Sequence, residues 1–239
     1  MTIICASDLH IGYVDKKRSD TDRRYRKIND FFELVKTKEP ERLILCGDIL
    51  DLWRYPSKDK INNEVLQNIL KIDEDYHLVH GAIENLKGLF DEVETTYIWG
   101  NHDYEVKKRI DLGSKVTIRD EFRDKDLNIF FCHGWRFDMW QRRFAWAYGW
   151  LVTWFPYLYR AYIKNTPWQI KKNKTDYLHL KDKTHEKAKK KIRWRKYDYL
   201  IMGHTHTKVD DPKLFNCGDM ITNFSYIEIV DRKPYWRTL

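Results

Sequence analysis

The chain has no hydrophobic run long enough to cross a membrane, although 42% of its 239 residues are hydrophobic. Its longest uncharged stretch is Phe144–Tyr159, with 16 residues, whereas a spanning helix needs about 20. This stretch also contains Gly149 and Pro156. A span here would separate strands that we expect to share one site, so we expect no transmembrane segment.

The sequence also lacks the features of secreted and thiolate-rich proteins. Its start, MTIICASDLH, has no basic region followed by a long apolar segment, so it does not resemble a secretory signal. None of the four cysteines shows CxxC spacing, and each lies near the end of a short apolar run, which is typical of buried thiols. We expect a cytoplasmic protein without a disulfide framework. No internal repeat or low-complexity linker is visible, so residues 1–239 are interpreted as a single domain.

Short apolar runs recur along the chain, and most of them end in a polar cluster. They read TIICASDLH, RLILCGD, TTYIWGNHD, NIFFCHG and YLIMGHTH. Because these runs do not alternate cleanly between apolar and polar residues, they are typical of strands buried on both faces. A further run near the C-terminus, FSYIEIV, alternates more clearly and predicts another strand.

Helical patterns lie between the strands. Apolar residues from Ile28 to Val35 recur at helical spacing, and the segment ends before Pro40. The stretch 61–90 is interpreted as helix-rich, with a break near Gly81 or Gly88. Strands that alternate with helices predict an α/β architecture.

Residues 135–196 interrupt this rhythm and are interpreted as a mostly helical, aromatic and basic insertion. The net charge is +8 for the whole chain, but 164–196 has thirteen Lys or Arg against three acidic residues. Within 144–164, tryptophans recur at every fourth position, which predicts an amphipathic helix with an aromatic stripe. Three roles stay open for it: packing on the core, capping the site, or contacting a membrane surface, with the cations of 144–196 over anionic lipid.

The polar clusters that follow the strands contain carboxylates, imidazoles and one amide. In an open α/β sheet the carboxyl ends of the strands converge on one edge, where ligands bind. Such oxygen and nitrogen ligands suit Mn²⁺, Fe or Zn²⁺. The ligands are too many for one tetrahedral zinc, so two metal ions are expected. The clusters are Asp8-x-His10, Gly47-Asp48-x-x-Asp51, Gly100-Asn101-His102-Asp103, His133-Gly134 and Gly203-His204-Thr205-His206.

This ordered set of motifs, from residue 8 to residue 206, resembles the calcineurin-like metallophosphoesterase superfamily. The resemblance implies a four-layer αββα sandwich that holds a dinuclear metal centre, most simply with two Mn²⁺ ions. It implies ligands for one metal from Asp8, His10, Asp48 and His206. It implies that Asp48 bridges to a second metal, whose other ligands are Asn101, His133 and His204.

The resemblance also implies the catalytic roles. His102 would lie beside the scissile phosphate as proton donor or charge stabiliser, and Asp103 would orient its ring. Asp51 would be an outer-sphere or structural residue. The two metals would clamp the phosphate oxygens, and a metal-bound hydroxide would attack in line at phosphorus.

The flanking residues narrow the substrate class. HGWRFDMW, GHTHTK and FNCGDMITNFSYIEI resemble the UDP-2,3-diacylglucosamine pyrophosphatase-like branch, which implies a lipid-bearing diphosphate handled at the inner face of the membrane. In the lipid A enzyme of that branch, GNRD and HGD are typical where this chain has His102 and Trp135. A metal-dependent nuclease or cyclic-nucleotide phosphodiesterase is the alternative, since the basic run could neutralise nucleic-acid phosphates. A non-catalytic scaffold is disfavoured, because every motif position is filled.

Overall fold

The computed structural model describes residues 1–13, 18–52, 77–103, 106, 112–138, 174–209 and 211–239. Its helices are α1 (Arg18–Lys38), α3 (His77–Glu92), the short 3₁₀ turn η2 (Gly134–Phe137) and α7 (Lys174–Arg195). Its strands are β1 (Thr2–Ala6), β2 (Arg42–Cys46), β3 (Thr95–Ile98), β4 (Val116–Arg119), β5 (Glu121–Asp124), β6 (Ile129–Cys132), β7 (Tyr199–Met202), β8 (Leu214–Asn216), β9 (Ser225–Val230) and β10 (Lys233–Thr238).

Within the described residues the strands form two sheets. The larger sheet has the order β10-β9-β1-β2-β3-β4, and the smaller has the order β5-β6-β7-β8. Strands β1, β2, β3 and β4 run parallel, as do β6, β7 and β8, whereas β9, β10 and β5 pair antiparallel at one side of each sheet. The carboxyl ends of the parallel strands therefore meet at one edge of each sheet.

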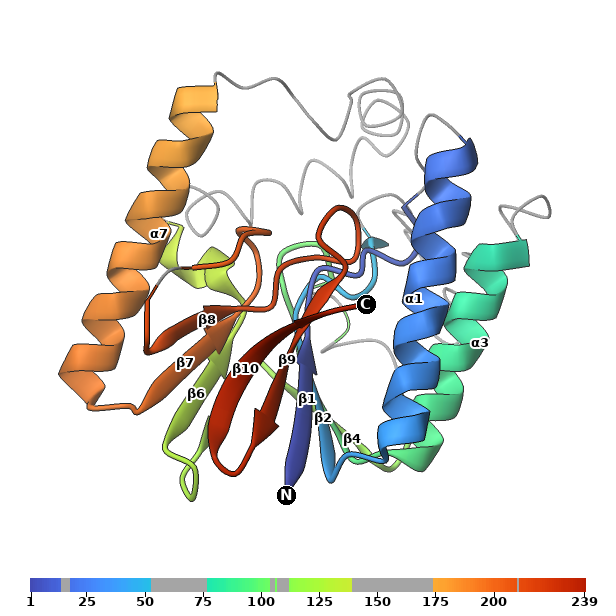
Figure 1. Ribbon diagram of the computed structural model, residues 1–239, viewed down its shortest axis with the longest axis horizontal. Coiled ribbons are helices and arrows are strands. Elements are labelled where there is room, and N and C mark those ends of the chain that lie inside the picture. Colours follow the sequence, from blue (N-terminus) through green and yellow to red (C-terminus); the bar gives the residue numbers. More distant parts are fainter. Residues whose placement is uncertain (14–17, 53–76, 104–105, 107–111, 139–173, 210) are drawn as a thin grey trace.

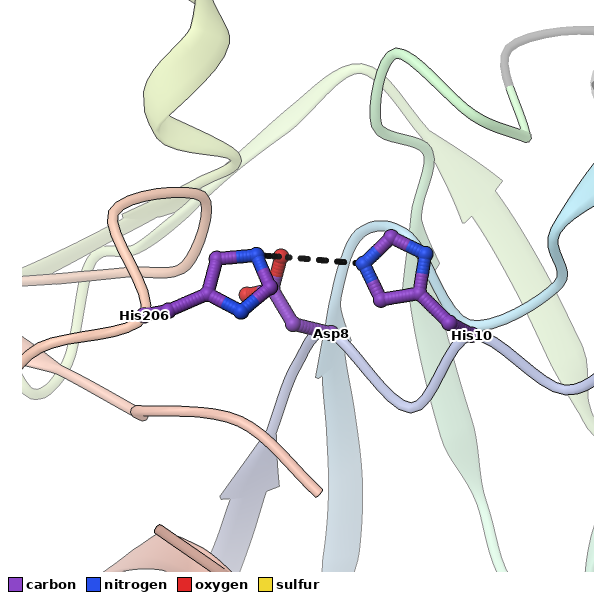
Figure 2. A group of neighbouring side chains, drawn as sticks. All are labelled: Asp8, His10 and His206. Atoms are coloured by element: carbon purple, nitrogen blue, oxygen red, sulfur yellow. Dashed lines mark ion pairs between the residues drawn. The ribbon is translucent and has the colours of Figure 1, made fainter. Parts of the chain in front are cut away.

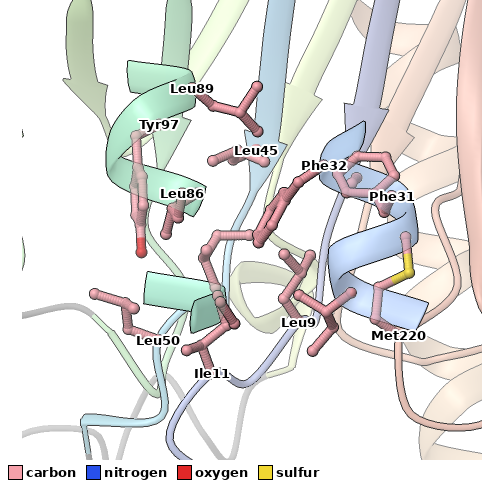
Figure 3. Packing of buried hydrophobic residues seen from close by; sticks show 14 of the residues in the cluster. Leu9, Ile11, Phe31, Phe32, Leu45, Leu50, Leu86, Leu89, Tyr97 and Met220 are labelled. Atoms are coloured by element: carbon pink, nitrogen blue, oxygen red, sulfur yellow. The ribbon is translucent and has the colours of Figure 1, made fainter. Parts of the chain in front are cut away.

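The alternation of side chains along β2 separates two layers of the core. Leu43 and Leu45 pack with the helices α1 and α3 on one face of the larger sheet. Ile44 and Cys46 point the opposite way and pack with β6 and β7 residues of the smaller sheet. Since successive strand residues face opposite sides, one apolar strand serves both layers. Figure 3 shows the layer under the helices, in which Phe32 of α1 lies beside Leu45.

The outer face of the smaller sheet is covered by α7. Ala188 and Ile192 of this helix pack with Leu200 and Met202 of β7 and are almost fully buried. Figure 1 shows α7 against the smaller sheet, and α1 and α3 against the larger one. The layers are thus helix, sheet, sheet and helix, and the predicted α/β sandwich is confirmed.

The helix α3 differs from the sequence prediction, because it runs through Gly81 and Gly88 without the expected break. A helical glycine costs about 1 kcal/mol relative to alanine, and the burial of Ile83, Leu86 and Leu89 against the larger sheet outweighs that cost. The segment 144–164 lies outside the described residues. No helix in the described part of the chain combines the length and apolar character that a bilayer span requires.

Candidate metal centre

The polar clusters predicted from the sequence follow five parallel strands of the structure. Residues 7–10 follow β1, 47–51 follow β2, 99–103 follow β3, 133–134 follow β6 and 203–206 follow β7. Strand polarity therefore brings their side chains to one edge, where the two sheets meet. Within the described residues, three groups of side chains lie close enough to share a metal ion: Asp8, His10 and His206; His10, Asp48 and His102; Asp48, His133 and His204.

The first group joins the end of β1 to the end of β7. His206 Nε2 lies 3.2 Å from Asp8 Oδ1, and His10 Nε2 lies 3.8 Å from the same oxygen. Figure 2 shows both imidazoles directed at this carboxylate. Asp8 and His10 have no exposed surface. The donor atoms of these two residues are therefore buried, whereas the His206 side chain is 18% exposed.

Asp48 lies between this first group and a second group, which consists of Asp48 itself, His133 and His204. Its Oδ2 is 3.3 Å from His133 Nε2 and 4.0 Å from His10 Nε2. His204 completes the second group, and its ring lies 5.2 Å from that of His133. One carboxylate is therefore within reach of two groups of donors, as a bridging ligand between two metals would have to be.

Several of these residues have strained backbone conformations. Positive φ angles occur at Asp8 (55°), His10 (46°), Asp48 (55°), His204 (80°) and His206 (52°). Such left-handed conformations are uncommon for residues with a Cβ, and they persist where the surroundings enforce them. Here the loops fix each other, because the Asp8 amide donates to Gly47 O and the His10 amide to Asp48 O, both at 2.9 Å.

Two glycines allow the loops to approach this closely. A Cβ on Gly100 would lie 2.2 Å from Asp48 Oδ1, and a Cβ on Gly47 would lie 2.5 Å from the His133 ring. Gly47 also has a φ of 88°. A side chain at either position would push a donor out of the centre.

Most of the histidines are oriented through their second ring nitrogen. His206 Nδ1 lies 3.0 Å from Asp219 Oδ2, and His133 Nδ1 donates to Cys46 O at 2.7 Å. These bonds leave Nε2 of both rings for a metal, which is the arrangement typical of metal-ligating histidines. In the sequence Asp219 lies within FNCGDM with no sign of this role, because only the fold places it beside His206.

The orientation of His102 differs from the expectation. Its Nδ1 lies 2.9 Å from Asp51 Oδ1, whereas the carboxylate of Asp103 accepts from the amides of Ile49 and Gly100 and from the Tyr97 hydroxyl. The ring-orienting contact expected of Asp103 thus belongs to Asp51. Asp103 instead fixes the two loops against each other, and sequence adjacency to His102 could not reveal this.

The pKa values reflect the crowding of charges. Burial raises the pKa of the Asp48 carboxyl, but attraction to His133, His102 and His10 outweighs burial and lowers it. Burial lowers the pKa of His133, yet Asp48 outweighs this effect and raises it to about 9. For His102 the attraction of Asp48 and Asp51 likewise outweighs desolvation, and its pKa is raised. The Asp48 carboxylate is thus ionised near neutral pH, and cations are stabilised beside it.

Asn101 tests whether the site fits a metal. It is 6% exposed, and among the described residues its Oδ1 has no hydrogen-bond partner. Both chain neighbours of Asn101 lie against Asp48. A Cβ on Gly100 would collide with Asp48 Oδ1, and the His102 amide donates to the same oxygen at 2.8 Å. Buried acceptors rarely remain unsatisfied. An amide oxygen among carboxylates and imidazoles fits a divalent cation such as Mn²⁺, Fe²⁺ or Zn²⁺.

The histidines of the centre differ in their exposure to solvent. The side chains of His102, His204 and His206 are 14%, 11% and 18% exposed, whereas those of His10 and His133 are fully buried. A ligand from solvent would therefore meet these three histidines first.

The comparisons with known proteins agree with this geometry. The family model described as calcineurin-like phosphoesterase matches residues 1–208. One curated relative, which forms part of the nuclease SbcCD of Staphylococcus saprophyticus, is 28% identical over 130 residues. That alignment covers 52% of this chain and 30% of the relative, so the chain spans about a third of the relative's length.

Solved structures also align with the chain. A conserved uncharacterized protein of Streptococcus pneumoniae TIGR4, described as a predicted phosphoesterase, has 15% identity and a TM-score of 0.34. The alignment covers 99% of this chain and 97% of that protein. A second structure has 11% identity and a TM-score of 0.41, with 99% and 98% of the two chains covered.

Proposed function

The chain belongs to the calcineurin-like phosphoesterase family, and from this premise we propose that it hydrolyses a phosphodiester or pyrophosphate bond with two divalent metal ions. Members of the family are phosphoesterase hydrolases that use divalent metals. The observation that carries the proposal is the position of Asp48, whose Oδ2 lies within 4.0 Å of donors from both groups. A carboxylate in this position could bridge the two ions of such a site.

The proposed ligands divide between the two ions. Asp8, His10 and His206 hold one, Asn101, His133 and His204 hold the other, and Asp48 bridges them. When bound, the cations would neutralise charge on the phosphate and supply a nucleophile from water at neutral pH. We propose Mn²⁺ as the native metal, with Fe or Zn²⁺ as the alternatives, because the ligand set contains no thiolate.

His102 is the proposed proton donor. Its side chain is 14% exposed, and Asp51 holds its Nδ1. Burial lowers its pKa, but Asp48 and Asp51 outweigh burial and raise it, which favours the protonated ring. It can therefore give a proton to the departing ester oxygen from Nε2. Asp103 would support this role indirectly, by fixing the loop that carries His102.

For the substrate we propose a nucleotide-diphosphate lipid similar to UDP-2,3-diacylglucosamine. The support is the resemblance of HGWRFDMW and FNCGDMITNFSYIEI, together with the aromatic and basic residues of 144–196, which would meet lipid at a membrane surface. A nuclease is the second candidate, supported by the match to part of a nuclease and by the thirteen cations of 164–196.

A panel of substrates tests both candidate functions, hydrolysis of a lipid diphosphate and hydrolysis of nucleic acid. Protein dialysed against a chelator and reloaded with Mn²⁺ would be assayed on a phosphodiester, a phosphomonoester, a UDP-linked lipid and DNA, with liposome sedimentation in parallel. We expect the lipid diphosphate to be hydrolysed fastest and the protein to sediment with anionic liposomes. Preference for DNA without liposome binding would favour the nuclease. No metal-dependent hydrolysis of any substrate would refute the phosphoesterase proposal.

A further inference from the structure

Thr205 stands between the proposed ligands His204 and His206 and is held from outside its own loop. Its side chain is buried, and its Oγ1 lies 2.8 Å from His185 Nε2 on α7 and 2.9 Å from Asn216 Nδ2 at the end of β8. The hydroxyl that separates the two ligand histidines is thus bound by two other elements of the fold.

The hydroxyl of Thr205 is bound from two sides. The Asn216 amide donates to Thr205 Oγ1 and, also at 2.9 Å, to Gly203 O. His185 Nε2 is hydrogen-bonded to the same hydroxyl. The His185 ring is neutral near pH 7, because its burial, and then the nearby charge of Lys181, lower its pKa to about 4, so one ring nitrogen donates and the other accepts.

The helix α7, which carries His185, is held against the smaller sheet by polar and apolar contacts. Lys187 Nζ donates to Phe137 O at 2.9 Å, Lys189 pairs with Asp211, and Lys191 pairs with Glu121. Together with the apolar contacts of Ala188 and Ile192, these bonds fix α7 on the smaller sheet. The position of His185 is therefore set by the packing of α7, whose sequence lies in the 135–196 block.

The loop itself needs such support. The φ angles of 80° at His204 and 52° at His206 are strained for residues with side chains, and such conformations persist only where the surrounding structure enforces them. Some hydrogen bonds within the described residues act on the ligand residues themselves: the His204 amide donates to Asp8 Oδ2, and Asn223 Nδ2 donates to His206 O. The Thr205 hydroxyl adds a side-chain restraint between the two ligand residues.

We propose that His185 and Thr205 are positioning residues, which hold His204 and His206 in their metal-binding arrangement and couple the seating of α7 to the metal affinity of the centre. The inference rests on the proposed function, because it takes both histidines as ligands. Partners that orient metal ligands typically change metal affinity about 10–100-fold when removed.

Matched substitutions test the inference on the full-length protein. Thr205→Val removes the hydroxyl and keeps the shape of the side chain, whereas Thr205→Ser keeps the hydroxyl. His185→Leu removes the ring nitrogen that is bonded to Thr205, and the exposed His80 on α3 provides the control His80→Leu. The primary readout is the dissociation constant for Mn²⁺, measured by competition with a chelator, together with the melting temperature of the metal-free protein.

We expect Thr205→Val and His185→Leu to weaken Mn²⁺ binding about 10–100-fold, while Thr205→Ser and His80→Leu stay within about threefold of the wild type. The double variant of Thr205→Val and His185→Leu should bind no more weakly than either single one, because all three lose the same hydrogen bond. Rescue by serine distinguishes positioning from a general loss of stability.

The outcomes separate the two proposals. If the wild type itself binds no Mn²⁺, the proposed function fails. If the wild type binds and both Thr205→Val and His185→Leu bind equally well, the positioning role is refuted and the proposed function stands. Should Thr205→Val fail to fold, His185→Leu decides: wild-type affinity in that variant refutes the inference, and weakened affinity supports it.

Discussion

The two sheets contribute different chemistry to one site. The larger sheet supplies the proposed acidic and amide ligands Asp8, Asp48 and Asn101 together with the imidazole of His10. The smaller sheet supplies only imidazoles among the proposed ligands: His133, His204 and His206. Each of the two outer donor groups contains members from both sheets. Neither sheet therefore holds a complete site, and the centre depends on how the sheets pack against each other.

The largest effect is expected at Asp48, the carboxylate that lies near donor atoms from both sheets. Asp48→Asn keeps the shape of the side chain but removes the charge that lies between both donor groups. We expect hydrolysis to fall by at least about 1,000-fold, by analogy with the loss of major electrostatic groups from active sites, and Mn²⁺ stoichiometry to drop. Asp30→Asn, at an exposed position on α1, is the control. Near-normal turnover with Asp48→Asn would contradict the bridging role.

A narrower effect, on turnover but not on metal binding, is expected at His102. His102→Ala should spare metal binding and reduce turnover about 100- to 10,000-fold, the usual contribution of a general acid. Measurement of kcat and of the Mn²⁺ dissociation constant distinguishes an effect on turnover from an effect on metal binding. Asp51→Asn, which removes the partner of His102 Nδ1, should give an intermediate loss. If His102→Ala keeps full activity, the proton-donor assignment is wrong.

Adjacent residues of β2 test the dependence on sheet packing. Ile44 packs between the sheets and Leu45 packs under the helices, and both are fully buried. Substitution of either by alanine should destabilise the protein by about 2–5 kcal/mol, measured by urea unfolding. Only Ile44→Ala should also weaken Mn²⁺ binding, because it loosens the contact between the sheets. Equal metal affinities in the two variants would argue against a centre that depends on sheet packing.

The smallest effect concerns the smaller sheet and α7. Since the pKa of His185 is lowered to about 4 from an ordinary 6.5, the unfolded chain binds a proton between these values and the folded chain does not. The neutral His185 side chain therefore contributes to the free energy of unfolding fully above pH 6.5, and this contribution is lost as the pH falls from 6.5 towards 4.

Urea unfolding of the metal-free protein at pH 7 and pH 5 checks this expectation. The wild type should lose about 1–2 kcal/mol more than His185→Gln over this interval, since glutamine does not titrate. An identical loss in both proteins would show that His185 is not buried in its neutral form.

Much of the fold was predictable because its signals are local. The strand-length apolar runs ended where the strands end, and the helical spacing of Ile28 to Val35 marked α1. The helix α3 was only partly predicted, since its glycines indicated a break that burial of Leu86 and its neighbours overrides. The roles of Asp51 and Asp103 could not be assigned from the sequence, because both follow strand ends and only side-chain direction distinguishes them.

The amino-acid order is enough to predict which polar side chains gather at one edge, since a polar cluster after a buried parallel strand must lie at the carboxyl edge of the sheet. The order of those clusters also identifies the family. Which groups meet depends on the tertiary structure: Asp48 lies between His10 and His133, Asp219 lies beside His206, and His185 is bonded to Thr205. The physical reason is that these contacts join segments far apart in the chain, and the packing of two sheets and α7 sets their distances.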